Sequence, residues 1–391
     1  MLCKPIFSAL TPLLAPLAML PLMTACSPSQ PAPQPKADFA PEASTDPAPV
    51  AAPAPQPTPT TDTHAPPKPG ATKTFTDWTA GCDNALRCTL GSLLPDASIG
   101  EDTITLNLTR EPGPVASGGG KVSLAIETRN DQSATKRPPA SFTVDGKPIA
   151  LRDAAAAATA IAAAIANAQS LKILDASGAT LATVSLKGAA AALRYIDAQQ
   201  GRAGSIDAVV AKGPAPSRAP TPALPVIAAV APSGAAAKLT PAQIATMRKR
   251  GACDIGNFPS GADPEQFAPE VHALGGGKSL AILPCSTGAY NLIGALFIID
   301  GARITPAQTD APSGFDETGA DSGTPVRSVV NGSFESGILT SYAKARGLGD
   351  CGVHQSFVWD GTRLRLSEQS EMGECRGNID YITTWRAKVT R

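Results

Sequence analysis

The chain has 391 residues, and its 33 lysines and arginines balance its 33 aspartates and glutamates, so that the formal charge is zero. This balance argues against nucleic-acid binding, which needs a basic surface to neutralise phosphates. Aromatic residues make up only 4% of the chain, and much of its 43% hydrophobic content is alanine. The length allows two or three domains, with thin cores that would benefit from disulfide bonds.

The first 25 residues have the pattern of an export signal. Lys4 provides a positive charge, and an apolar stretch containing three prolines runs from Ile6 to Leu22. The stretch is short for a membrane span, and its prolines would break a helix. Residues 23–26 resemble a bacterial lipobox, which implies cleavage before Cys26 and its acylation as a stable membrane anchor. Ser27, the residue after this cysteine, favours delivery of the lipoprotein to the outer membrane, where it would face the periplasm.

Proline-rich segments divide the rest of the chain. Residues 26–72, which begin with the lipidated cysteine, are rich in Pro and Ala and lack apolar periodicity, so we expect a disordered tether. A second such stretch at residues 213–235 predicts a linker. The remaining segments, 73–212 and 236–391, each have the size of an ordinary domain.

Alternating apolar residues predict an antiparallel α+β fold for residues 73–212. Asp153 is the expected N-cap of an alanine-rich helix that runs to Gln169, and a second helix is expected from Ala189 to Gln200, ending at Gly201. Asp145-Gly146 is a typical two-residue hairpin turn. The expected strands are 102–110, 122–126, 141–144, 147–149, 171–174 and 181–186.

Residues 236–391 are expected to be mainly antiparallel β. A short helix at 241–249 has Thr240 as its N-cap, and residues 303–325 are expected to form a polar loop. The predicted fold class is therefore α+β: an antiparallel α+β domain followed by a mainly β domain, both held by disulfides. The expected strands of the second domain are 279–283, 289–300, 336–344, 354–359, 363–367 and 381–389.

Six cysteines remain when Cys3 is assigned to the signal and Cys26 to the anchor. An even number in an exported protein indicates disulfides. Six cysteines allow 15 pairings. Neither a zinc site nor redox catalysis is expected, because the chain has no Cys-x-x-Cys and only three histidines. We therefore expect no metal and no cofactor. Proximity along the chain favours the pairs Cys82–Cys88, Cys253–Cys285 and Cys351–Cys375.

His354 is a candidate general base. Asp350, four residues earlier, would orient its ring, and Ser286 or Ser356 would be the nucleophile. No Gly-x-Ser-x-Gly motif marks either serine. A histidine on a half-exposed strand, without a catalytic role, is the favoured interpretation.

Three acidic and basic residues cluster around Cys375. Glu371 and Glu374 would be the carboxylate pair of a glycoside hydrolase, with Arg376 beside them. A loop held by salt bridges is the favoured alternative. The three tryptophans are expected to anchor the core, although any one of them would also suit sugar stacking. They are Trp78, Trp359 and Trp385.

A glycine-rich segment, Gly275-Gly276-Gly277-Lys278-Ser279, has the ending of a phosphate-binding loop. The motif requires an earlier glycine at position 272, where this chain has His272 in an expected loop. We therefore expect a turn that leads into a strand.

Several short motifs occur in order between residues 75 and 390. They include Phe75-Thr76-Asp77-Trp78, Cys82-Asp83-Asn84, Ala192-Leu193-Arg194-Tyr195-Ile196-Asp197, Gln199-Gln200-Gly201-Arg202, Leu283-Pro284-Cys285, Gly349-Asp350-Cys351-Gly352 and Met372-Gly373-Glu374-Cys375-Arg376-Gly377. Together they resemble the DUF1176 family of proteobacterial proteins. The resemblance implies that the protein is exported, and no activity comes with the family name. The first half alone also resembles the invasion-associated locus B family, which is linked to host-cell entry.

Two functions are compatible with these features. The favoured one is a non-enzymatic lipoprotein of the cell envelope, held on the membrane through Cys26, that binds an envelope protein or the cell wall. The alternative is an envelope hydrolase that uses His354 with Asp350, or the acidic group near Cys375. No nucleic-acid partner is expected.

Overall fold

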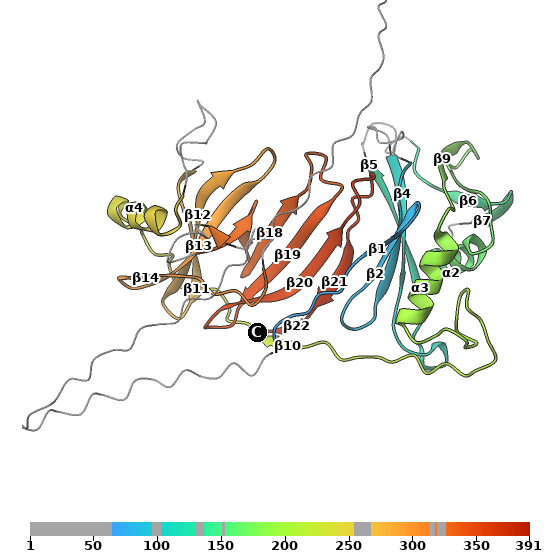
Figure 1. Ribbon diagram of the computed structural model, residues 1–391, viewed down its shortest axis with the longest axis horizontal. Coiled ribbons are helices and arrows are strands. Elements are labelled where there is room, and N and C mark those ends of the chain that lie inside the picture. The colour runs from blue at the N-terminus through green and yellow to red at the C-terminus, as the bar shows by residue number, and fades with distance from the viewer. Residues whose placement is uncertain are drawn as a thin grey trace, which may run out of the picture. The chain divides into compact units, whose positions relative to one another are not determined.

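The computed structural model describes residues 65–95, 103–129, 137–150, 153–253, 267–312, 317–318 and 326–391 (Figure 1). The segment Asp62–Arg391 forms one compact unit. Strands account for 42% of the structure and helices for 13%, so that antiparallel sheets dominate the fold. The predicted export signal, Cys26 and most of the tether lie outside the described residues. Within those residues, no helix is long and apolar enough to cross a bilayer.

The first sheet is an antiparallel meander of five strands in chain order. Leu106 and Leu108 alternate with polar residues, so that both point to the same, buried face. Cys82 and Cys88 lie directly opposite each other on neighbouring strands and form the first disulfide. The strands are β1 Lys73–Phe75, β2 Trp78–Cys82, β3 Cys88–Ser92, β4 Thr103–Arg110 and β5 Val122–Arg129.

Two helices and a four-stranded antiparallel sheet follow. Helix α2, Ala154–Ile165, begins as predicted, because the Asp153 carboxylate accepts hydrogen bonds from the amides of the first turn. Helix α3, Ala189–Gln199, begins after Gly188, whose φ of 93° and contact with the Phe75 carbonyl leave no room for a Cβ. The strands of the sheet, in spatial order, are β7 Lys147–Ala150, β6 Ser141–Val144, β8 Leu171–Leu174 and β9 Thr180–Val184.

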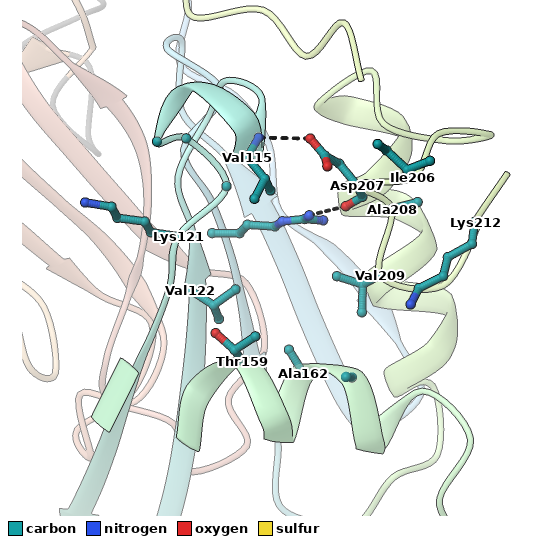
Figure 2. Close-up of a pocket in the computed structure, with 15 residues that line it drawn as sticks. Val115, Lys121, Val122, Thr159, Ala162, Ile206, Asp207, Ala208, Val209 and Lys212 are labelled. Atoms are coloured by element: carbon teal, nitrogen blue, oxygen red, sulfur yellow. Dashed lines mark hydrogen bonds between the residues drawn. The ribbon is translucent and has the colours of Figure 1, made fainter. Parts of the chain in front are cut away.

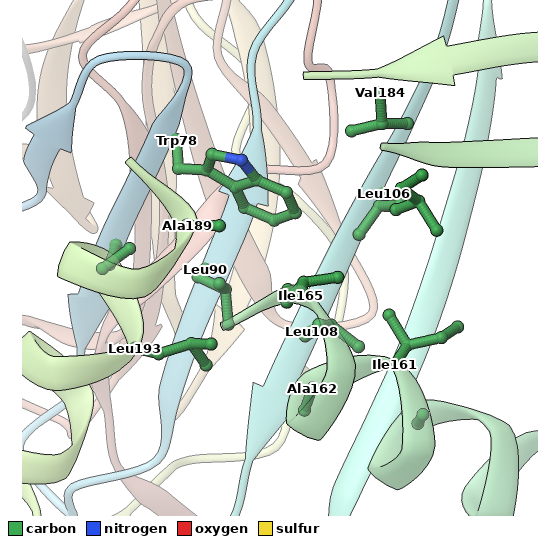
Figure 3. Packing of buried hydrophobic residues seen from close by; sticks show 14 of the residues in the cluster. Trp78, Leu90, Leu106, Leu108, Ile161, Ala162, Ile165, Val184, Ala189 and Leu193 are labelled. Carbon is green, nitrogen blue, oxygen red and sulfur yellow. The ribbon is translucent and has the colours of Figure 1, made fainter. Parts of the chain in front are cut away.

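An apolar core fills the space between the first sheet and the two helices (Figure 3). Ile161 and Ile165, one helical turn apart on α2, both point into it, as their spacing predicts. Trp78 is fully buried, and its indole Nε1 donates to the Ser185 carbonyl at 2.8 Å, so that its single polar atom is satisfied. Trp78 therefore anchors this core.

The second half contains two antiparallel sheets that share a core. In β12, Leu280 and Ile282 face the other sheet, whereas Ala281 and Leu283 face helix α4, Pro241–Arg250. The strands of one sheet are β11 Glu270–Gly275, β12 Lys278–Thr287, β13 Leu292–Asp300, β14 Arg303–Pro306, β15 Glu317–Thr318 and β16 Val326–Val330. Those of the other are β17 Ser333–Glu335, β18 Ile338–Lys344, β19 Gly352–Trp359, β20 Leu364–Met372 and β21 Ile382–Arg386.

Disulfides and tryptophans hold this half together. Cys253 after α4 is bonded to Cys285 in β12, and Cys351 is bonded to Cys375. The three disulfides thus join the cysteines that proximity along the chain favours. Trp359 is buried between the two sheets, and the half-buried Trp385 packs against the same core.

Several segments differ from the expectations. His272 lies in β11 rather than in a loop. By contrast, Gly276 and Gly277 form a turn into β12, which agrees with the expectation for the glycine-rich segment. The segment 336–344 does not start as a strand, because Ser336 and Gly337 adopt positive φ in the turn between β17 and β18. Part of the expected loop 303–325 is strand, since β14 folds back on β13.

The predicted linker at 213–235 contacts the rest of the unit at several positions. Its strand β10, Val226–Ala228, pairs in parallel with β22, Lys388–Thr390. Ala219 is buried, and the Gly113 amide donates to the Pro220 carbonyl. Both halves of the chain therefore contact this segment.

Candidate functional site

His354 lies in the middle of β19, opposite Tyr342 of β18 on one side and Ser370 of β20 on the other. The imidazole packs edge-on against the Tyr342 ring, with centroids 5.9 Å apart. These residues help to line a pocket of about 220 Å³, smaller than the roughly 300–1,000 Å³ of typical ligand pockets. Burial lowers the pKa of His354, against the opposing charge of Glu368, so that the neutral imidazole is favoured at pH 7.

The Asp350 carboxylate has other partners than His354. It is fully buried and accepts hydrogen bonds from the Arg346 guanidinium and, at 2.7 Å, from the Gly377 amide. Burial would raise the pKa of Asp350, but these hydrogen bonds outweigh it and hold the pKa below its ordinary value. Asp350 thus ties together the two loops that the Cys351–Cys375 disulfide joins.

Neither of the candidate serines lies opposite His354. Ser356 is two residues further along β19, where it pairs with Thr340 and Glu368, and Ser286 is in β12 of the other sheet. The strand register instead places Ser370 opposite His354. A neutral imidazole and a hydroxyl therefore share one small pocket, without the Asp350 carboxylate to orient the ring.

The acidic group near Cys375 joins the two halves of the chain. The Glu371 carboxylate accepts hydrogen bonds from the amide and the hydroxyl of Thr72, and Glu374 accepts one from the Thr74 hydroxyl. Arg376 is paired with Asp77 at 2.5 Å. The Arg376–Asp77 pair agrees with the interpretation of a loop held by salt bridges, whereas these contacts of the two carboxylates are hydrogen bonds from threonines.

A larger pocket, of about 530 Å³, lies in the first half (Figure 2). The loop after β4, the start of β5, helix α2 and the segment after α3 form its walls. Its apolar lining includes Val122 of β5 and Ala162 of α2. Two further apolar residues at its edge are unusually exposed, Val115 at 50% and Ile206 at 66%. The basic residues of the lining are Arg110, Lys121 and Lys212, and the acidic one is Asp207.

Two buried arginines form the frame of this pocket. Arg110 donates to the fully buried Asp197 carboxylate at 2.9 Å and also to the Asp207 carbonyl. Arg202 is fully buried and donates to the carbonyls of Glu111 and Gly113. Burial lowers the pKa of Arg110, although the negative charge of Asp197 acts in the opposite direction. Burial and the nearby positive charge of Arg110 together lower the pKa of Arg202 to about 10.

The same carboxylates fix the segment after α3 over the loop after β4. Asp197 accepts hydrogen bonds from the Val209 and Val210 amides, both at 2.9 Å. The side chain of Asp207 accepts the Val115 amide at 2.9 Å, and this bond helps to lower the pKa of Asp207. The pocket wall is thus held by hydrogen bonds to buried charges, so that its shape is set before any ligand arrives.

The loop at the pocket needs glycine for close packing. A Cβ on Gly120, whose φ is 67°, would lie 2.8 Å from a nitrogen of the Arg202 guanidinium. A Cβ on Gly119 would lie 2.5 Å from the Pro112 carbonyl oxygen. Larger residues at either position would displace the loop from the arginine that supports it.

Sequence reasoning missed this pocket. Asp197 and Arg202 belong to the motifs that resemble the family, but nothing in the spacing of these motifs indicates that both side chains are buried. A usable signal is the position of Asp197 beside the inward-facing Ile196 of α3, since a carboxylate next to a buried helix face requires a buried cation. Arg110, at the end of an alternating strand, is that cation. Among the described residues, no group of three or more His, Cys, Asp or Glu side chains could hold a metal.

The comparisons with known proteins identify the family. The model of the family described as "Protein of unknown function (DUF1176)" matches residues 72–388. The chain is 28% identical over 350 residues to "Uncharacterized protein YpfG" of Escherichia coli (strain K12), covering 81% of this chain and 92% of that protein. No solved structure shows a significant match. The resemblance of the first half to the invasion-associated locus B family is not supported by these comparisons. The chain belongs to the DUF1176 family, as its ordered motifs predict.

Proposed function

We propose that the protein is an exported lipoprotein that acts as a non-enzymatic binding module of the cell envelope. The signal pattern and Cys26 motivate the anchor, which would place it on the outer membrane, facing the periplasm. Three disulfides support export, since such bonds persist in oxidising compartments. The partner would be an envelope protein or a component of the cell wall.

The pocket of Figure 2 is the observation that carries the binding role. Its volume falls within the range of ligand pockets, and its lining combines apolar surface with a few charges. The carboxylate and the hydroxyl in that lining are already engaged. Asp207 accepts the Val115 amide, and the Thr159 hydroxyl donates to the Ala155 carbonyl of its own helix. The pocket therefore offers contact area in which neither the Asp207 carboxylate nor the Thr159 hydroxyl is unengaged.

A crosslinking pull-down from intact envelopes tests this function. Ala163 and Ala160 are both exposed on α2, but only Ala163 belongs to the pocket lining. Ala163→Trp would fill the pocket, and Ala160→Trp is the matched control with the same change of side chain. We expect one recurrent partner with the wild type and with Ala160→Trp, and its loss with Ala163→Trp. Equal capture by both variants, or no partner at all, would contradict the proposal.

The anchor is tested separately by Cys26→Ala. We expect this change to release the protein from the membrane fraction, because the acyl chains would be absent. Membrane association that persists in Cys26→Ala would remove the anchor from the proposal and leave the pocket unaffected.

An envelope hydrolase is the second candidate. The pairing of neutral His354 with Ser370 favours it. A panel of envelope substrates, assayed with the wild type and with His354→Ala, would decide. Hydrolysis that depends on His354 would replace the binding role, whereas no hydrolysis by the wild type would leave the binding role as the better account.

A further inference from the structure

We propose that the pocket of Figure 2 binds an anionic amphiphile, a molecule with one carboxylate or phosphate group and an apolar body. This inference rests on the proposed binding function and adds the chemical class of the ligand. It follows from the charge of the pocket, from unused hydrogen-bonding capacity in its frame and from the apolar residues at its edge.

The charges that line the pocket are not balanced. Three lining residues are basic and one is acidic. The buried charges behind them do balance, since Arg110 and Arg202 face Asp197 and Asp207. The excess positive charge therefore belongs to two exposed lysines, Lys121 and Lys212, which have no carboxylate partner among the described residues.

The two lysines stand on opposite sides of the pocket (Figure 2). The ammonium group of Lys212 points toward the pocket. That of Lys121 points outward, and it would reach a ligand by rotation of its flexible, exposed side chain. An anionic group held at the pocket mouth would thus meet charge from both sides.

The frame of the pocket retains donors without acceptors. The side chain of Arg110 is only 7% exposed, and its Nε has no hydrogen-bond partner. Nη1 of the fully buried Arg202 makes no hydrogen bond either, although it forms a salt bridge with Asp207 at 3.8 Å. Such buried donors are rare, because each costs free energy when it is left unpaired. Because both atoms are buried, a ligand in the pocket would reach them only through ordered water, and their unmet hydrogen bonds favour a negatively charged ligand over a positively charged one.

The apolar part of the ligand is indicated by the edge and floor of the pocket. Val115 and Ile206 are two of the most exposed large apolar residues of the described structure, and both belong to its lining. Small side chains at Ala162 and Ala163 leave space between α2 and β5. An apolar body lying there would cover the exposed residues, as burial of apolar surface favours.

A direct titration tests the ligand class. The oxidised full chain would carry Cys26→Ala, so that no detergent is needed, and would be titrated calorimetrically with monomeric dodecanoate and dodecyl phosphate. Dodecyltrimethylammonium reverses the charge, and inorganic phosphate lacks the apolar body. We expect one site for each anionic amphiphile, with binding at least tenfold tighter than for either comparison compound.

Charge variants then locate the site. Lys121→Glu/Lys212→Glu should weaken binding of both anionic amphiphiles at least tenfold. Lys147→Glu/Lys172→Glu is the matched control, since both lysines are exposed, lie on β7 and β8 and change the net charge equally. This control should leave the dissociation constant within twofold. Ala163→Trp should abolish binding, and Ala160→Trp should not.

The outcomes separate this inference from the proposed function. Equal binding of cationic and anionic amphiphiles, or binding that the lysine variants leave unchanged, would overturn the ligand class. Binding to phosphatidylglycerol vesicles without binding of monomeric amphiphiles would overturn it as well, in favour of a membrane surface. If Ala163→Trp still removed the pulled-down partner in any of these cases, the binding function would stand. If Ala163→Trp did not remove the partner, both the ligand class and the binding function would fail.

Discussion

Asp197 is the residue on which most of the pocket frame depends. Its fully buried carboxylate accepts hydrogen bonds from Arg110 and from three successive amides, those of Val209, Val210 and Ala211. A buried ion pair adds little net stability when both partners are present, because desolvation offsets their attraction. Removing one partner is different, since the other charge is then left buried and uncompensated.

We therefore expect Asp197→Asn to destabilise the protein by about 3–5 kcal/mol. Urea unfolding measures this change. The control is Glu111→Gln, which breaks the partly exposed pair between Arg87 and Glu111 and should cost about 0–1 kcal/mol, as surface pairs do. Equal losses in the two variants would show that burial of Arg110 does not govern the stability of this region.

His354 predicts a dependence of stability on pH. In the folded state, burial holds the pKa of His354 below the ordinary value of 6.5, which applies to the unfolded state. At a pH between the folded and the unfolded pKa, the unfolded state therefore binds more protons than the folded state. Stability should fall as the pH drops below 6.5 toward the folded pKa. We expect His354→Asn to lack this loss, as measured by urea midpoints at pH 7.5, 6.5 and 5.5. The same difference in urea midpoint between wild type and variant at all three pH values would contradict this prediction.

At the scale of elements, the strands and helices with clear periodicity could be predicted from the sequence. Asp153 as an N-cap, the spacing of Ile161 and Ile165 and the alternation in β4 each follow from local rules. The turn at Ser336-Gly337 could not be recognised, because serine rarely adopts positive φ. The pocket was missed for another reason: its residues come from four segments that only the tertiary fold brings together.

The disulfides are elements whose stabilisation should follow the length of chain that each closes. The sequence separations are 6 for Cys82–Cys88, 24 for Cys351–Cys375 and 32 for Cys253–Cys285. Loop-closure entropy gives about 2.2, 3.4 and 3.7 kcal/mol in that order. We expect paired Cys→Ala variants to lose stability in the same order, measured by urea unfolding without reductant. A largest loss at Cys82–Cys88 would show that local packing outweighs loop entropy.

At the scale of the whole compact unit, polar contacts connect the sheet β1–β5 with the sheet that contains β21. Asn378 is fully buried and donates to the Ser92 carbonyl and to the Asn107 side chain. Arg386 is paired with the buried Asp83. Strand β21 also contacts β2 and β3 directly. The predicted domains 73–212 and 236–391 therefore share an interface that contains buried polar groups, which are costly to expose singly and couple the two sides.

This interface predicts that both halves unfold in one transition. Trp78→Phe leaves tryptophan fluorescence from the second half, and Trp359→Phe/Trp385→Phe leaves that of Trp78 in the first half. In each background, the fluorescence and circular dichroism transitions in urea should coincide. Asn378→Ala should lower the free energy of unfolding by about 1–3 kcal/mol in both backgrounds, and the urea midpoint with it, because Ser92 and Asn107 lose a buried partner. Two results would contradict this prediction: separate transitions for the two fluorescence signals, or an effect of Asn378→Ala on only one of the two signals. Either result would mean that the halves are independent domains, joined by contacts too weak to couple their unfolding.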